Sequence, residues 1–581
     1  MEDLSSLSKS LHEILSAPGG GESLASTVEE YLNTPEVSTK QAVCETLLEL
    51  LIEGDEDFKL KRREIVLSDT SLTYLPVLLP LSTSIPPSNQ LVLLIAEFSK
   101  AREVVFGLTE GIQSILDRAE GLQVSDDEDG DFEDEEISVD WPGLIQEYEL
   151  IISCLRVAIP RLTNSKSTPT LLSLSESISS SLPILAHQAT TSSARVLLSG
   201  LCELVQVIWE WVQGTGDKGG EQRSILSNLL FESVTLLGHK VNAKLTERWF
   251  LATFPRFRNM PTSGESLEGW EEGQKILDVA WSTAITLNLT SVDLVNKIID
   301  PSHITVHSSL ASLNLLSSQL PNSSSALTSI LDPVPPTLLD DSMTILCAAL
   351  SGSSVDAGVV YTWALLHYYL TSKRGTLEYD NASMLLELLV PLTAQHPSSL
   401  MRLALFKLIG GIISLQSTVV NKMELFKQLL EPANPFDNIR IQSLSLLREN
   451  ISSGELLSDV LVEILFPVLF VPPSQQDQED DPFTYPPMDL LNSPYIAWWT
   501  ECLTLLWFLV DYDKEEVSGV RQKTGEEVMK DWFGGVERKL RELQDFLKSS
   551  SDNDEDEFGG AGFMMMRLED ALNRVRSGLS F

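Results

Sequence analysis

The chain has 581 residues, of which 43% are hydrophobic, and its formal net charge at pH 7 is −42. This length exceeds what one ordinary hydrophobic core accommodates, so the sequence predicts several domains or one array of repeats. So acidic a surface repels nucleic acids and anionic membranes, which are bound through clustered Lys and Arg, and it favours basic protein partners.

The first segment, residues 1–120, is predicted to form N-terminal helical repeats. Its start is polar and acidic, where a signal peptide needs a basic region and an apolar run. Four leucines there fall on one helical face: Leu4, Leu7, Leu11 and Leu15. A basic cluster at residues 59–63 has two interpretations, an aid to nuclear import or a solvated helix face. The expected location is the cytoplasm, with the nucleus as an additional one.

Residues 121–140 are predicted to be an acidic disordered loop. Residues 125–136 contain nine acidic residues and few apolar ones, so the segment cannot bury enough apolar surface to order itself. Ser125 precedes acids of the kind that acidophilic kinases prefer, which makes it a candidate phosphorylation site. Deleting residues 125–136 is therefore expected to leave folding and partner capture largely intact.

Residues 141–395 are predicted to form central helical repeats. Strand-like alternation is almost absent, and Pro, Ser and Gly mark the connectors. Apolar residues recur at helical spacing over long runs here and in the flanking regions: residues 91–116, 144–159, 194–212, 225–237, 279–299, 357–370, 384–392 and 456–469.

Residues 396–548 are predicted to be C-terminal HEAT-like repeats, because two segments in this region align without a gap. Pro397 corresponds to Pro435 and Arg402 to Arg440, an offset of 38 residues. A repeat near that length, built of paired helices, is typical of HEAT or armadillo solenoids. The predicted fold class is therefore all-α, a HEAT/armadillo-like α-solenoid of stacked helical repeats with acidic disordered inserts. Solenoids of this kind mostly bind other proteins.

The end of the chain is predicted to be an acidic linker, residues 549–562, and a C-terminal helix, residues 563–581. Residues 472–481 form a further acidic insert. The most apolar stretch, residues 496–510, is too short to cross a membrane and contains Glu501, so it is predicted to be a buried helix.

No active site is predicted, and neither a catalytic, a cofactor-binding nor a metal-binding residue is nominated. The cysteines are far apart and sit in apolar, helix-like contexts typical of reduced core residues: Cys44, Cys154, Cys202, Cys347 and Cys502. A GxGxxG match at residues 214–219 follows a helix rather than a strand, so it indicates a connector and not a nucleotide site. HExxH, GxxxxGK[ST] and GxSxG are absent from the sequence.

Partner binding is predicted for arginines and tryptophans of the C-terminal repeats, since both residue types are enriched at binding hot spots. Two alternatives stay open: Arg440 pairs with an acid of the neighbouring repeat, and the tryptophans pack in the core. The candidates are Arg402, Arg440, Arg448, Trp498, Trp499 and Trp532.

Residues 396–470 resemble the family of glomulin, a plant lateral-root protein and fungal YAP-binding proteins. The resemblance rests on residues 399–408 and 434–448, where a Pro–polar–Arg helix start precedes a small–hydrophobic–Leu–Leu–Lys/Arg helix. It implies a HEAT-like solenoid without catalysis. Glomulin binds the RING-box subunit of cullin ubiquitin ligases through its C-terminal repeats, and the fungal members bind a YAP-type bZIP transcription factor in the oxidative-stress response.

The resulting hypothesis is a non-enzymatic adaptor that binds a RING-box/cullin ubiquitin ligase and regulates it. The alternatives are a YAP-binding protein that supports a bZIP factor and a generic transport or scaffold solenoid. The interface is placed on residues 398–547, so deletion of residues 398–581 is expected to abolish partner capture. Nucleic acid and membrane are not expected as partners.

Overall fold

The computed structural model describes residues 20–52, 56–67, 71–121, 139–163, 167–214, 219–259, 269–300, 306–322, 326–452, 456–471, 481–550 and 559–579. These residues form 28 α-helices and a few short 3-10 helices, and they contain no strand. The expected all-α fold class is confirmed. The chain forms two compact units.

The first unit comprises Met1–Leu245, Leu267–Leu331 and Gly352–Gly358. Its helices are α2 (Gly20–Leu32), α3 (Val37–Ile52), α4 (Glu56–Leu67), α5 (Ser71–Leu81), α6 (Pro86–Phe98), α7 (Ala101–Gly121), α8 (Trp141–Ala158), α9 (Ser167–Gln188), α10 (Thr191–Gln213), α11 (Gly220–Leu237), α13 (Trp270–Thr286), α14 (Ser291–Ile299), α15 (Val306–Gln319) and α16 (Ala326–Ile330).

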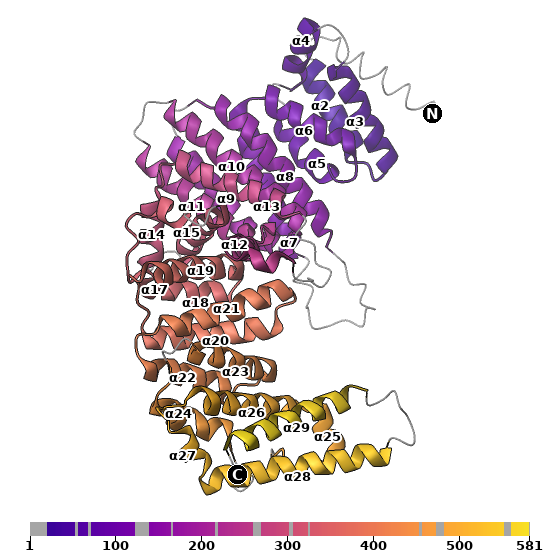
Figure 1. The fold of residues 1–581 in the computed structure, drawn as a ribbon. Helices are drawn as coiled ribbons and strands as arrows, with labels where there is room; N and C mark the ends of the chain where they lie inside the picture. The colour runs from indigo at the N-terminus through magenta and orange to yellow at the C-terminus, as the bar shows by residue number, and fades with distance from the viewer. Residues whose placement is uncertain are drawn as a thin grey trace, which may run out of the picture. The chain divides into compact units, whose positions relative to one another are not determined.

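Helices of the first unit stack in two layers (Figure 1). In one layer α2, α5, α7, α9, α11 and α15 each contact the next, and in the other α3, α6, α8, α10 and α13 do so. Each repeat thus presents one helix to each layer and packs on its neighbours, which is the arrangement of an α-solenoid.

The second unit comprises Thr246–Ser266, Asp332–Ser351 and Val359–Phe581. Its helices are α12 (Leu245–Thr253), α17 (Leu338–Asp341), α18 (Met343–Ser351), α19 (Val355–Ser372), α20 (Tyr379–Gln395), α21 (Ser399–Leu415), α22 (Val419–Leu430), α23 (Asp437–Ser452), α24 (Asp459–Leu469), α25 (Pro487–Asn492), α26 (Tyr495–Tyr512), α27 (Val520–Thr524), α28 (Glu527–Ser550) and α29 (Gly559–Leu579).

The same two-layer order recurs in the second unit. Helices α18, α20, α22 and α24 contact one another in turn, while α23, α26 and α29 follow in the opposite layer. Glycines allow close packing of α21 in that opposite layer. A Cβ on Gly411 would lie 2.5 Å from Leu366 of α19, and one on Gly410 would lie 2.9 Å from Leu446 of α23. The predicted boundary between residues 395 and 396 falls inside this unit, between α20 and α21, which contact each other.

Cationic side chains cap the carboxyl ends of earlier helices in both units. Arg63 Nε donates to the Leu51 carbonyl at the end of α3, and Arg161 donates through Nη1 and Nη2 to the carbonyls of Ala96 and Ser99, each at 2.6 Å. The final carbonyls of a helix have no partner within the helix, and the helix dipole places negative charge there. Some of the basic residues of this acidic chain therefore join neighbouring repeats.

Replacing Arg161 by Met should lower the free energy of unfolding of the first unit by about 1.5–3 kcal/mol, because two charge-assisted hydrogen bonds are lost. Chemical denaturation, with hydrogen exchange in α6 and α8 as the local measurement, would give the loss in the free energy of unfolding. Arg102→Met is the matched control, since Arg102 is exposed on α7. Equal losses in both variants would show that the capping contact contributes nothing specific.

Two of the predicted helical runs are each split into a pair of helices. The run at residues 91–116 breaks where α6 ends at Ser99, whose backbone is extended and whose side chain is buried. The run at residues 279–299 breaks before α14, where Thr290 and Asp293 form a capping box. Thr290 thus bonds a local backbone group, whereas the Ser99 hydroxyl donates to the Leu67 carbonyl of another helix, and apolar periodicity detects neither contact.

Several expectations fall outside the described residues. They include the leucine face of residues 4–15, the candidate phosphorylation site Ser125, and most of the three acidic segments, at residues 122–138, 472–480 and 551–558.

Candidate protein-binding site

The three predicted tryptophans lie in the interior of the second unit. Trp498, Trp499 and Trp532 are 7%, 2% and 2% exposed. Trp499 stacks on Phe483 with ring centroids 5.0 Å apart, and Trp532 meets Phe470 edge to face at 5.0 Å. Their placement corresponds to the core-packing alternative. Contact with a partner through these rings stays a prediction that their burial does not support.

The two arginines that mark the sequence repeat reach the carbonyls that precede their own helices. Arg402 Nη1 donates to the carbonyls of His396 and Pro397 at 2.6 and 2.9 Å, just before α21. Arg440 Nε donates to the Leu430 carbonyl at the end of α22, 3.3 Å away. The repeated Arg therefore has a repeated structural task, the joining of consecutive helices.

The ion pair of Arg440 is not the one suggested by the sequence. It forms an ion pair with Asp437 of its own helix at 2.9 Å, rather than with an acid of the neighbouring repeat. Its guanidinium lies 4.7 Å from the centroid of the Trp498 ring on α26, a cation–π contact between α23 and α26. Two of the predicted residues thus meet, but they do so at a buried contact between helices.

Arg448 lies half-buried where three helices meet. Its Nη2 lies 2.7 Å from Glu501 Oε2 on α26, and Arg567 of α29 reaches the other oxygen of the same carboxylate at 3.1 Å. Three helices are joined by one carboxylate. Close by, α26 and α29 enclose a hollow of about 210 Å³, lined by Thr500, Thr504, Trp507, Arg567, Asp570, Ala571 and Arg574.

Cys44, Cys154 and Cys202 are buried thiols. Burial raises the thiol pKa of Cys44 to about 11 and those of Cys154 and Cys202 to about 12, so the reactive thiolate is scarce at neutral pH. Within the described part of the chain, no group of three or more His, Cys, Asp or Glu is placed to hold a metal ion.

One described helix, α10, is long and apolar enough by length and composition to cross a membrane. Half of its most apolar stretch is buried, and it packs against α8, α11 and α13 of the first unit. This packing is that of a core helix in a helical array.

A second hollow, larger than the one between α26 and α29, is a groove of about 480 Å³ across α8, α10 and α13, three successive helices of one layer. Each helix contributes residues three or four positions apart, which is the spacing of a single helical face. Small residues hollow its middle, and the Val196 side chain, 50% exposed, is part of its apolar floor. We name these residues the α8–α10–α13 groove: Glu149, Ile152, Ser153, Arg156, Ser192, Arg195, Val196, Leu197, Ser199, Gly200, Glu203, Glu272, Lys275 and Ile276.

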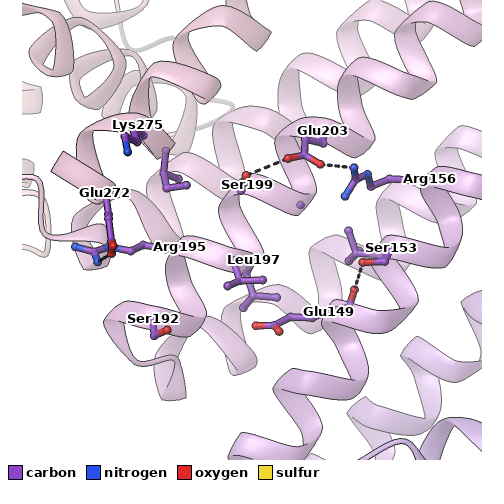
Figure 2. A pocket seen from close by; sticks show the side chains of 14 residues that line it. Glu149, Ser153, Arg156, Ser192, Arg195, Leu197, Ser199, Glu203, Glu272 and Lys275 are labelled. Atoms are coloured by element: carbon purple, nitrogen blue, oxygen red, sulfur yellow. Dashed lines mark hydrogen bonds and ion pairs between the residues drawn. The ribbon is translucent and has the colours of Figure 1, made fainter. Parts of the chain in front are cut away.

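Ion pairs tie the walls of this groove together (Figure 2). Arg156 of α8 pairs with Glu203 of α10, and Ser199 donates to the same carboxylate at 3.2 Å. On the other side, Arg195 of α10 pairs with Glu272 of α13 at 2.7 Å. The Arg195 guanidinium also donates to the carbonyls of Val241 and Gly269, which fixes its position.

The sequence interpretation missed this groove. Its residues on α8 and α10 belong to predicted helical runs, with Ser192 just before one of them, but the prediction concerned the buried stripes of these helices and not the outward one. Its residues on α13, Glu272, Lys275 and Ile276, precede the predicted run at residues 279–299. A usable signal is present in α10, where Ser192, Ser199 and Gly200 interrupt the bulky residues of one helical face. Small residues on an outward face leave room between neighbouring helices.

Comparison with known proteins gives only low similarities to solved structures. No protein-family model matches the sequence, and no curated protein matches it. The crystal structure of Kap121p is similar over 96% of this chain, with 13% identity and a TM-score of 0.23, and this chain spans 59% of its length.

Two further solved structures show comparable values. A circular tandem repeat protein with novel repeat topology and enhanced subunit contact surfaces has 14% identity and a TM-score of 0.21, with coverage of 95% of this chain and 97% of that one. Kap121p bound to Pho4p has 11% identity and a TM-score of 0.21, with coverage of 96% and 73%. None of these values extends to function. The chain is an α-solenoid of stacked helical repeats, a fold class that typically serves protein binding.

Proposed function

We propose that this protein is a non-enzymatic solenoid adaptor that holds a segment of a partner protein in the α8–α10–α13 groove. The observation that carries the proposal is the groove itself, which crosses three successive repeats and combines an apolar floor with fixed polar walls. Repeat proteins bind partners along such surfaces, because side chains from consecutive repeats form one continuous face.

The charge of the groove sets it apart from the rest of the chain. Its lining has three acidic and three basic residues, whereas the whole chain carries a net charge of −42. A balanced, partly apolar surface within an acidic exterior suits a protein ligand rather than a nucleic acid. The acidic exterior still speeds encounter with a basic partner, and association should slow as salt rises.

Absence of catalysis is part of the proposal. The buried thiols are protonated at neutral pH. Burial lowers the pKa of His239 and His367, and neither histidine lines the groove. The groove walls hold carboxylates and guanidiniums in ion pairs, which stabilise a shape and do not activate a nucleophile.

The resemblance to the glomulin and YAP-binding family adds two specific partners to the proposal, the RING-box subunit of a cullin ligase and a YAP-type bZIP factor. They would bind at the C-terminal repeats, where the Arg448–Glu501–Arg567 cluster and the hollow between α26 and α29 offer an open polar surface. The cytoplasm, and for a bZIP partner also the nucleus, is the corresponding location.

Site-specific photo-crosslinking in the native cell tests the proposal. A photoreactive residue at Val196 should form adducts with a partner protein that do not form from Phe106, an equally exposed apolar position on α7 in the other layer. Excess unlabelled wild-type protein should suppress the adducts by competing for the partner. Excess unlabelled Gly200→Trp variant should not suppress them, because its indole fills the groove. Identical adducts from both positions would contradict a binding role for the groove.

The crosslinked proteins also decide between the two named partners. A RING-box subunit captured from a third position at Arg567 supports the ligase role, and a bZIP factor supports the stress role. Capture of either protein at Val196 and not at Arg567 would move its interface to the first unit.

A further inference from the structure

The α8–α10–α13 groove has one unpaired charge on each outer wall. The pairs Arg156–Glu203 and Arg195–Glu272 neutralise four of the six charged residues. The remaining two are Glu149 on α8 and Lys275 on α13, and the described residues offer neither side chain an ion-pair or hydrogen-bond partner. Figure 2 places Glu149 and Lys275 at opposite ends of the groove.

We propose that the groove selects an extended peptide segment with a basic side chain for Glu149, an acidic side chain for Lys275 and an apolar side chain between them. This inference deepens the proposed function and rests on it. It names the chemistry of the bound segment and the direction in which the segment crosses the three helices.

Glu149 is the stronger of the two determinants. Its side chain is half-buried, and burial raises the pKa of its carboxyl above the ordinary value. An unpaired carboxylate in such a place is poorly solvated, so an incoming Lys or Arg side chain gains more there than at an exposed acid. Lys275 is exposed, and its contribution is mainly to set orientation.

The middle of the groove suits an apolar side chain. Gly200 has no side chain, and a Cβ placed on it would find only the Ile152 methyl group, at 3.4 Å. Val196 of the same helix, 50% exposed, supplies most of the open apolar surface around this position, and the buried Leu197 lies beneath it. Burying one aliphatic or aromatic side chain of the partner here supplies the affinity, while the two charges supply direction.

The helix spacing predicts the sequence spacing of the bound segment. Packed helices lie about 8–10 Å apart, so α8 and α13 are separated by about 16–20 Å across α10. An extended chain advances about 3.3 Å per residue and turns every second side chain to the same face, so the basic and acidic residues should stand about six positions apart. The apolar residue should stand about two positions from one of them and about four from the other, so that all three side chains face the groove.

Selection from a randomised peptide library on the full chain tests this inference. The wild type should enrich peptides with the base–apolar–acid pattern at that spacing. Glu149→Lys should weaken binding of those peptides on the order of tenfold, because an attraction becomes a repulsion. The double variant Glu149→Lys/Lys275→Glu should instead enrich peptides in which the order of base and acid is reversed.

Three further variants separate failure of this inference from failure of the proposed function. Gly200→Trp fills the groove. Val196→Glu changes only an exposed floor residue, so it tests the groove if Gly200→Trp folds poorly. Glu110→Lys, at an exposed position on α7, is the matched charge control. Enriched peptides that bind Glu110→Lys normally, fail with Val196→Glu and respond to the charge reversals support the inference.

The inference would be overturned if the enriched peptides bind the groove but lack the charge pattern. It would also be overturned if the same charge pattern is enriched after the charges of Glu149 and Lys275 are reversed. Either result would leave the proposed function standing. The same holds if the Val196 crosslink captures a partner but the library gives no groove-dependent peptide. Loss of the Val196 crosslink itself would overturn the proposed function.

Discussion

Replacing Trp532 by Ala should lower the free energy of unfolding of the second unit by about 3–5 kcal/mol, the usual range for a buried Trp. The ring is 2% exposed and lies edge to face against Phe470, with Phe533 at 5.5 Å. Truncation removes this apolar burial and leaves a cavity on α28 beside Phe470, which directly follows α24. Hydrogen exchange should show the loss first in these helices, because each repeat depends mainly on its neighbours.

Trp507→Ala is the matched control. Trp507 is half-buried at the hollow between α26 and α29, where Arg574 lies 5.5 Å from its ring. Less buried area is lost there, so the destabilisation should be clearly smaller than at Trp532. A larger stability loss at Trp507, or reduced partner capture by folded Trp532→Ala with unchanged exchange rates, would favour the hot-spot interpretation of Trp532.

The fold was predictable because its signals are local and repeated. Helical periodicity depends on residues three and four positions apart, and the match of Arg402 to Arg440 shows that a helix pair recurs. What these arginines do was not predictable. Each turns toward carbonyls that precede its own helix, and only the stacked arrangement places those carbonyls within reach. Sequence patterns show that a cation recurs, not which group it contacts.

The positions of the tryptophans were not predictable either. Clustering of large aromatic residues is expected both in a core and at an interface, and composition does not separate the two. The charge pattern of the groove was beyond prediction for a further reason. Its charges cancel in pairs between residues as distant in sequence as Arg195 and Glu272, so the unpaired Glu149 and Lys275 become apparent only in three dimensions.

The structure also changes how the C-terminal repeats should be tested. Deletion from residue 398 would remove α21, whose Ala404 carbonyl accepts a hydrogen bond from the buried indole N–H of Trp363 at 3.2 Å. The deletion would also uncover Leu366, which packs against Gly411 of α21. Loss of partner capture in that variant would then report damage to the remaining helices. Substitution of Arg567, which is exposed, changes the C-terminal surface without cutting through the stack.

Replacing Arg118 by Met should destabilise the first unit strongly and in a pH-dependent way. Glu147 of α8 is buried, and Arg118 of α7 donates through Nη2 to both carboxylate oxygens at 2.7 Å. Removing the cation leaves a buried carboxylate without its partner. Since the Arg118 side chain is itself 37% exposed, we expect a loss of about 3 kcal/mol at neutral pH, the lower end of the range for buried pairs.

The pH dependence follows from the carboxyl group. Burial raises the pKa of Glu147 above its ordinary value, and the Arg118 hydrogen bonds and charge oppose that rise. Without Arg118 the pKa should rise further. A carboxyl whose pKa is higher in the folded than in the unfolded state loses stability as pH rises through that interval. The deficit of Arg118→Met relative to the wild type should therefore be largest at neutral pH and shrink as the pH falls toward the ordinary carboxyl range.

Urea denaturation at about pH 7 and about pH 5 would measure both effects. The double variant Arg118→Met/Glu147→Gln should recover much of the loss at neutral pH and show a smaller difference between the two pH values, because no carboxylate remains to be charged in the interior. A deficit that is the same at both pH values, or a double variant as unstable as Arg118→Met, would mean that Arg118 acts through the packing of its aliphatic stem and not through the charge of Glu147.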